Sequence, residues 1–232
     1  MLRELLGILR ASDPLRDMGH NFGLMLELTL EMNLAAGHIF FGESRGDAES
    51  KRIHERDAEV NALERTIRRQ VLTHLAVPGN EADTPYSLLL MSLVKDVERL
   101  GDYAKNLSEL VEIRPEPLPS GPELEELQAI RHGVEHTFRS VSEVFAESNK
   151  DEAMELIRHG REVARRCDRL VMAIGHSDYD AATTTTFILG TRYYKRIGGH
   201  VLNVLSSVVM PLDRVDYYDE NGGAATSPQD AS

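Results

Sequence analysis

The chain has 232 residues, of which 41% are hydrophobic and 28% charged, a composition typical of a globular protein with one large or two small domains. Its net charge of −12 argues against a general affinity for nucleic acid or anionic lipid. The single cysteine, Cys167, excludes an internal disulfide and a multi-cysteine zinc site, and we expect a reduced, packed thiol.

The N-terminus and the apolar runs indicate a soluble, cytoplasmic protein. The first residues, Met-Leu-Arg-Glu-Leu-Leu-Gly, are too charged for a secretory signal. The longest apolar run, Ser87 to Val94, is well below the ~20 residues needed to span a bilayer. We therefore expect no membrane insertion, and peripheral association is compatible with the sequence.

Nearly every long segment carries the helical period and none alternates like a strand, so the sequence predicts an all-α fold. In the first half, apolar stripes and helix-breaking residues predict helices over about 13–41, 48–75 and 84–112. Thr29 is the one polar residue within the apolar stripe of the first of these helices.

The segment Arg114-Pro-Glu-Pro-Leu-Pro-Ser-Gly121 is the clearest linker in the chain. After it the plan repeats, with helices predicted over about 123–146, 151–174 and 182–212.

These elements divide the chain into two repeats of three helices. We expect the first repeat over residues 1–116, the second over 117–220, and a disordered Gly-, Ala- and Ser-rich tail over 221–232.

Residue-level similarity supports a duplication. The third helix contains Glu98-Arg-Leu-Gly-Asp-Tyr-Ala-Lys-Asn-Leu107, and the sixth contains Lys195-Arg-Ile-Gly-Gly-His-Val-Leu-Asn-Val204. Three residues are identical at matching positions: Arg99, Gly101 and Asn106 return as Arg196, Gly198 and Asn203. Because glycine is unfavourable inside a helix, its recurrence suggests close helix crossings at Gly101 and Gly198.

The same segments carry a resemblance to a known family. Glu98-Arg-Leu-Gly-Asp102 followed by Asn106 resembles the E-R-I-G-D-x-A-x-N-I signature of PhoU proteins, which occurs once per three-helix repeat. The segment from Arg192 to Asn203 is similar to the second copy of that signature, and Asp57-Ala-Glu-Val-Asn61-Ala-Leu-Glu64 is similar to a motif of the preceding helix. The resemblance covers residues 13–218 in the expected order.

The resemblance implies two antiparallel three-helix bundles in tandem, packed side by side. It also implies an accessory regulator of phosphate uptake and phosphate-starvation signalling rather than an enzyme. The expected partners are a phosphate transporter component, a sensor histidine kinase or both, and a homodimer is compatible with this role. Family members carry acidic motifs that hold divalent or iron ions on the bundle surface.

Four oxygen-bearing side chains form a candidate metal site. Glu98 and Asp102 lie one turn apart on one helix, as do Asp57 and Asn61 on the preceding helix. If these helices are antiparallel neighbours, the four side chains converge on a site suited to Mg, Mn, Ca or Fe, bound weakly and exchangeably. The alternative is a solvated acidic face with ordinary charge pairing to Lys105.

The second copy departs from this pattern. Lys195 and Gly199 stand where Glu98 and Asp102 stand in the first copy, and neither is a ligand for a hard cation. His200 is more often structural than a ligand in such a setting. The repeated arginines, Arg99 and Arg196, are expected to pair with acids such as Glu64, and direct contact with phosphate is the alternative.

Two rival functions stay open at this point. One is an accessory protein of another inorganic-phosphate permease, which would share the helical plan. The other is a di-metal carboxylate enzyme, which is disfavoured because its chemistry normally uses Glu-x-x-His pairs that do not stand out here.

Overall fold

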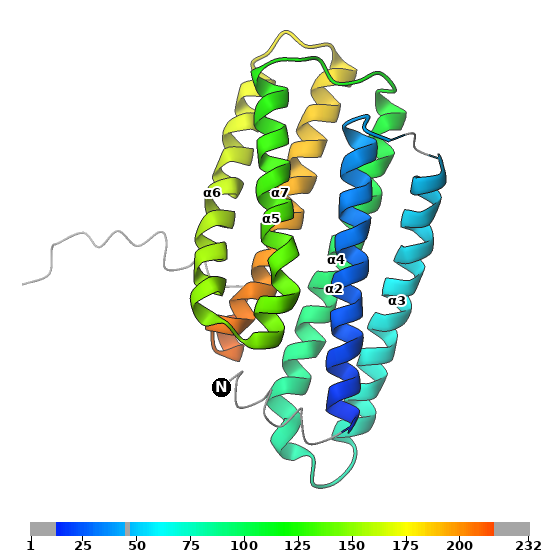
Figure 1. Cartoon of the computed structure of the whole chain (residues 1–232), viewed down its shortest axis with the longest axis vertical. Coiled ribbons are helices and arrows are strands. Elements are labelled where there is room, and N and C mark those ends of the chain that lie inside the picture. Colours follow the sequence, from blue (N-terminus) through cyan, green and yellow to red (C-terminus); the bar gives the residue numbers. More distant parts are fainter. Residues whose placement is uncertain (1–12, 45–46, 216–232) are drawn as a thin grey trace, which may run out of the picture.

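The computed structural model describes residues 13–44 and 47–215, and within them it contains six long α-helices, two short 3-10 turns and no strand. The predicted all-α fold is confirmed. The helices, shown in Figure 1, are α2 (Asp13–Phe40), α3 (Asp47–Leu75), α4 (Thr84–Ile113), α5 (Pro122–Glu147), α6 (Lys150–Gly175) and α7 (Ala181–Val209).

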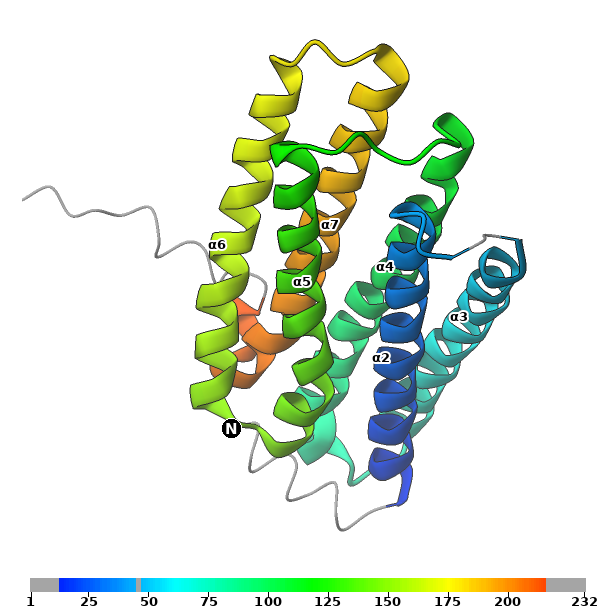
Figure 2. The same ribbon diagram turned by 45° about the horizontal axis from the view of Figure 1, so that its top comes forward.

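The helices form two bundles side by side. Helices α2, α3 and α4 pack on one another, as do α5, α6 and α7. The bundles meet mainly where α4 contacts α7, with a smaller contact between α2 and α5. Figure 2 shows the connection between α4 and α5, residues 114–121, crossing from one bundle to the other. The predicted tandem arrangement is confirmed.

The apolar stripes read from the sequence form the core. In α2, Met18, Phe22 and Met25 have no exposed surface. Thr29 is equally buried and satisfies its hydroxyl by donating to the Met25 carbonyl at 2.8 Å. A buried polar group in the stripe is therefore tolerated because it is hydrogen-bonded within its own helix.

The predicted helix ends agree with the structure to within about two residues, except at the last one. Helix α7 ends at Val209 rather than near Leu212. Pro211 cannot continue a helix, and the residue before a proline prefers an extended backbone, as Met210 shows with φ −96° and ψ 152°. A short turn, η2 (Leu212–Arg214), follows. The tail predicted over 221–232 lies outside the described residues.

Candidate functional site

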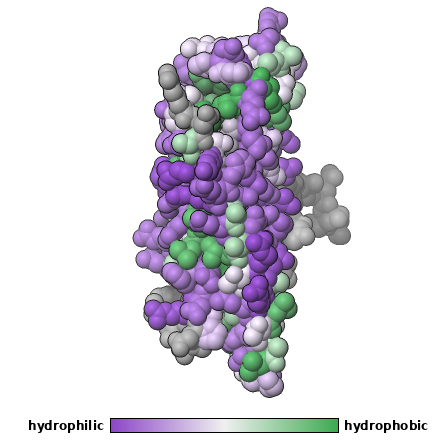
Figure 3. Space-filling model, turned by 90° about the vertical axis from the view of Figure 1, so that its right-hand side faces the viewer, coloured by the Kyte–Doolittle hydropathy of each residue, from purple (hydrophilic) through white to green (hydrophobic). Residues whose placement is uncertain are grey.

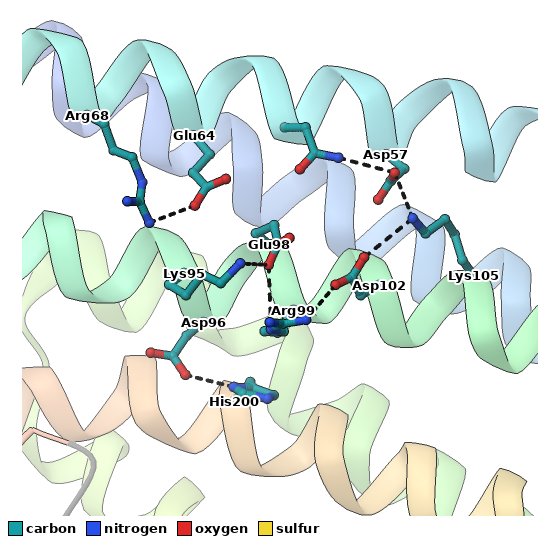
Figure 4. Close-up of polar contacts among 11 residues, drawn as sticks. Asp57, Glu64, Arg68, Lys95, Asp96, Glu98, Arg99, Asp102, Lys105 and His200 are labelled. Carbon is teal, nitrogen blue, oxygen red and sulfur yellow. Dashed lines mark hydrogen bonds and ion pairs between the residues drawn. The ribbon is translucent and has the colours of Figure 1, made fainter.

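The predicted metal residues lie along the seam between α3 and α4, which are packed neighbours in the first bundle. Figure 4 shows this seam, with side chains from both helices directed toward one another. Asp57 and Asn61, one turn apart on α3, are joined by a hydrogen bond from Asn61 Nδ2 to Asp57 Oδ2 of 3.2 Å. The expectation that the two helices bring their motifs together is met for these residues and Asp102.

Lys105 links the two helices. Its Nζ donates to Asp57 Oδ2 at 2.9 Å and lies 3.4 Å from Asp102 Oδ1. Burial lowers the pKa of Lys105, but the hydrogen bond and charge of Asp57, with a smaller contribution from Asp102, outweigh it and raise the pKa above its usual range. The ammonium group thus occupies the place between the two carboxylates that a cation would take.

Glu98 is joined to this cluster through Arg99. Its carboxylate accepts from Lys95 Nζ at 2.7 Å and lies 3.8 Å from Arg99 Nε. Arg99 in turn donates to Asp102 Oδ2 at 2.9 Å. Glu98 and Asp102 therefore share a basic neighbour. Its positive charge reduces the repulsion between two carboxylates that lie one helical turn apart.

The space beside the two repeated glycines, Gly101 and Gly198, tests the prediction of close helix crossings. A Cβ added at Gly101 would lie 3.5 Å from Asp57 Oδ1 and 3.4 Å from Met32 Cε, and at Gly198 it would lie 3.6 Å from Val134. These are ordinary contacts, so the prediction that the two glycines mark close helix crossings is wrong. Tighter side-chain packing lies at Gly190 and Gly160, where an added Cβ would come within 2.4 Å of Phe40 and 2.6 Å of Leu202.

The seam offers oxygen donors of the kind that a hard cation uses, but they are not gathered around one point. Asp57 Oδ1 is buried and accepts no hydrogen bond, so one carboxylate oxygen is unused. Across the described residues, no three His, Cys, Asp or Glu side chains are grouped so as to hold a metal ion. Asn61 and Lys105 complete the seam, and a metal would need to displace the ammonium group of Lys105 to reach both Asp57 and Asp102.

The prediction that the repeated arginines pair with acids is met for Arg99, but Glu64 is not its partner. Glu64 pairs with Arg68 on its own helix at 2.8 Å, and Arg99 pairs with Asp102. An acid four residues before an arginine is a favourable helical pair, and this local contact takes precedence over the cross-helix one.

Sequence reasoning missed Asp96, which joins the two repeats. This buried carboxylate on α4 contacts His200 Nδ1 and accepts from Asn203 Nδ2, each at 2.7 Å, and both partners lie on α7. Figure 4 shows Asp96 directed toward His200. The signal was present, because Asp96 interrupts the apolar stripe of α4 between Leu93 and Val97.

A second missed contact also joins the repeats. Arg131 on α5 is 5% exposed and donates to Glu43, in the connection after α2, at 2.6 Å and to Glu135 at 2.7 Å. Its guanidinium also lies 5.0 Å above the ring of Phe41. The hydrogen bond from Arg131 holds the pKa of Glu43 below its usual range, although burial opposes this.

Cys167 is free and fully buried, as predicted. Burial raises its pKa to about 12, so the thiol is not in its nucleophilic form near neutral pH. It contributes packing to the second bundle.

The second repeat has no oxygen-bearing side chain at the four positions that correspond to the candidate ligands. Matching Glu59-Val60 of α3 with Glu162-Val163 of α6 places Gly160 and Ala164 at the positions of Asp57 and Asn61. The contacts support this match. Asp57 contacts Lys105, and Gly160, at the position of Asp57, packs against Leu202, which is at the position of Lys105. The four counterparts of the candidate ligands are therefore Gly160, Ala164, Lys195 and Gly199.

These features define an all-helical protein of two tandem three-helix bundles with a seam of carboxylates on one of them. Residues 15–111 match the family model of the PhoU domain. The chain is 28% identical over 180 residues to "Phosphate-specific transport system accessory protein PhoU homolog" of Xylella fastidiosa (strain Temecula1), covering 74% of this chain and 72% of that protein.

The fold is similar to two crystal structures. That of PhoU from Pseudomonas aeruginosa aligns with a TM-score of 0.77 and 20% identity, covering 89% of this chain and 99% of the other. The crystal structure of the phosphate transport system regulatory protein PhoU from Streptococcus pneumoniae aligns with a TM-score of 0.73 and 17% identity. The alignment covers 84% of this chain and 92% of the other. The predicted resemblance to the PhoU family is confirmed by the family model over residues 15–111, by the relative and by the shared fold.

Proposed function

We propose that this protein is a PhoU-type accessory regulator of phosphate uptake and phosphate-starvation signalling, acting through contacts with other proteins. The observation that carries the proposal is the ordered set of family motifs on a tandem three-helix fold, together with a relative named as an accessory protein of phosphate-specific transport. The contacts proposed are with a phosphate transporter component, a sensor histidine kinase or both.

The surface offers a place for such a contact. No helix in residues 13–44 or 47–215 is long and apolar enough to cross a membrane. Figure 3 shows the face on the α3 side as largely hydrophilic with small separate hydrophobic patches. Around the turn from α3 to α4, Leu72, Val77 and Leu88 are each at least half exposed, which favours a partner contact at that end of the first bundle.

Deleting the gene and restoring it with variants tests this function. The deletion should disturb phosphate uptake or raise expression of phosphate-starvation genes, and the wild-type gene should restore both. Restoration with Leu72→Ser and Leu88→Ser together should fail while the purified variant stays folded; Met172→Ser, an exposed apolar position on α6, is the matched control. Unchanged phosphate handling in the deletion at both high and low phosphate would overturn the proposal.

We also propose that the seam of the first repeat binds a hard divalent or iron cation, such as Mg, Mn, Ca or Fe, through Asp57, Asn61, Glu98 and Asp102. Such a site should be weak and exchangeable, because the side chains of Asp102 and Lys105 are 27% and 22% exposed. Lys105 would compete with the metal for Asp57 and Asp102.

Metal titration of the wild type and two variants tests this site. Glu98→Ala with Asp102→Ala should abolish binding without unfolding the protein, because these side chains make helix-surface ion pairs. Lys105→Ala should strengthen binding by about tenfold, since removing one competing charge–carboxylate contact is worth roughly 1.5 kcal/mol. Equal affinity in the wild type and in all variants would leave the seam as an ion-pair network alone.

A further inference from the structure

A groove of about 490 Å³ opens in the second repeat at the seam between α6 and α7. It lies where the first repeat carries its carboxylates, because Gly160, Ala164, Lys195 and Gly199 all line it. The four oxygen-bearing side chains of the first seam are thus replaced by three residues with little or no side chain and one lysine. Loss of side-chain volume explains why the second seam is hollow.

The charge of the groove is opposite to that of the protein as a whole. Among the described residues that line it, one carboxylate, Asp168, faces five cations. These cations are Arg161, Arg165, Arg192, Lys195 and Arg196. Helix α7 has no acidic residue over its 29 positions, whereas α4, its counterpart, has five. In a chain with a net charge of −12, a groove lined by more cations than acids is a local feature.

Arg161 makes an interaction of its own, and the other four cations have two acidic partners between them, Asp168 and Glu162. Asp168 accepts from Lys195 at 2.5 and 2.6 Å and lies 3.8 Å from Arg192, so two cations share one carboxylate. Arg165 pairs with Glu162 at 3.3 Å. Arg196 pairs with none of the acidic side chains that the structure describes, although its counterpart Arg99 pairs with Asp102. The difference arises because Gly199 stands where the first repeat has Asp102.

We propose that this groove binds a phosphate group, either inorganic phosphate or the phosphate of a small ester such as a nucleotide. Arginine presents a planar fork of donors that matches phosphate oxygens, and lysine adds a mobile point charge. The volume leaves room for the anion, because a Cβ at Gly199 would meet no atom within 4 Å. The side chains of Lys195 and Arg192 are 32% and 46% exposed, so binding weakens as salt rises. This inference is independent of the proposed regulatory function.

Calorimetric titration of the full chain with inorganic phosphate and with ADP, at constant ionic strength, tests the groove. One of the two should bind saturably, and the tighter one identifies the source of the phosphate group. Lys195→Ala with Arg196→Ala should weaken binding by about tenfold or more, because charge-assisted hydrogen bonds are lost. Gly199→Asp should also weaken binding, since it supplies the carboxylate that pairs with the arginine in the first repeat. Its Cβ would meet no atom within 4 Å.

The first repeat supplies the matched control. Arg99→Ala removes the counterpart of Arg196 outside the groove, so it should leave phosphate affinity unchanged if the groove is the site. Absence of saturable binding by both anions would overturn the proposal, and so would equal losses in Arg99→Ala and in Lys195→Ala with Arg196→Ala. These outcomes are measured on purified protein and are separate from the phosphate-uptake phenotype, so either proposal can fail alone.

Discussion

The two repeats share a backbone plan but differ in the charge of one seam. Both keep an arginine, a glycine and an asparagine at matching positions of α4 and α7. The seam of the first repeat carries carboxylates that are held by Lys105 and Arg99, and the seam of the second is a cationic groove. The comparison teaches that the helical plan of the core is shared while the side chains of the surface seam differ in charge.

The interface between the repeats also uses different side chains on its two sides. Matching α4 with α7 pairs Asp96 with Tyr193 and Tyr103 with His200. The contact of Asp96 with His200 therefore corresponds to that of Tyr103 with Tyr193, whose rings lie 6.0 Å apart. Between them Tyr103 and His200 stack at 5.7 Å. One approximately two-fold interface thus uses a charged hydrogen bond on one side and an aromatic pair on the other.

The largest expected effect of a single substitution is at Gly190. This position is a glycine in α7, and its counterpart in α4 is the buried Leu93. Gly190→Ala would place a Cβ 2.4 Å from Phe40 Cζ, and Phe40 is itself packed edge-on against Phe41. Overpacking of this kind should lower the free energy of unfolding by about 2–3 kcal/mol.

Thermal or urea unfolding measures the effect of Gly190→Ala. Gly23→Ala on α2 is the control, because an added Cβ there meets no atom within 4 Å. Equal stability of the two variants would mean that the ring of Phe40 can move aside. The packing of Phe40 against Gly190 would then contribute little to stability.

A smaller loss is expected at Asp96. Asp96→Ala removes the acceptor of both His200 and Asn203 in the interface between the repeats. Two partly buried donors would lose their partner, which should cost about 1–2 kcal/mol in unfolding free energy. Asp102→Ala, which breaks exposed ion pairs, should cost at most about 1 kcal/mol and serves as the control. If Asp96→Ala cost no more than its control, the polar half of the interface would be no stronger than a surface pair.

The helices were predicted well because the period of apolar residues encodes them directly. Met18, Phe22 and Met25 repeat at helical spacing, and all three are buried in the core. One-turn spacing likewise placed Asp57 beside Asn61. Contacts between helices were harder to predict, because Lys105 reaches Asp57 across 48 residues and Arg131 reaches Glu43 across 88. No local pattern specifies such pairings, since they depend on how the bundles pack.

The smallest expected effect is a gain in stability at Gly199, the position that most clearly separates the two seams. Gly199 lies inside α7, where glycine costs more backbone entropy than alanine. An added Cβ meets no atom within 4 Å, so Gly199→Ala should raise the free energy of unfolding by about 0.5–1 kcal/mol. Gly198→Ala, one residue earlier, would contact Val134 at 3.6 Å and should gain less. Urea unfolding of both variants compares them directly. A loss of stability in Gly199→Ala would show that the groove is packed more tightly than its lining indicates. The contrast between a filled seam in the first repeat and a hollow seam in the second would then be wrong.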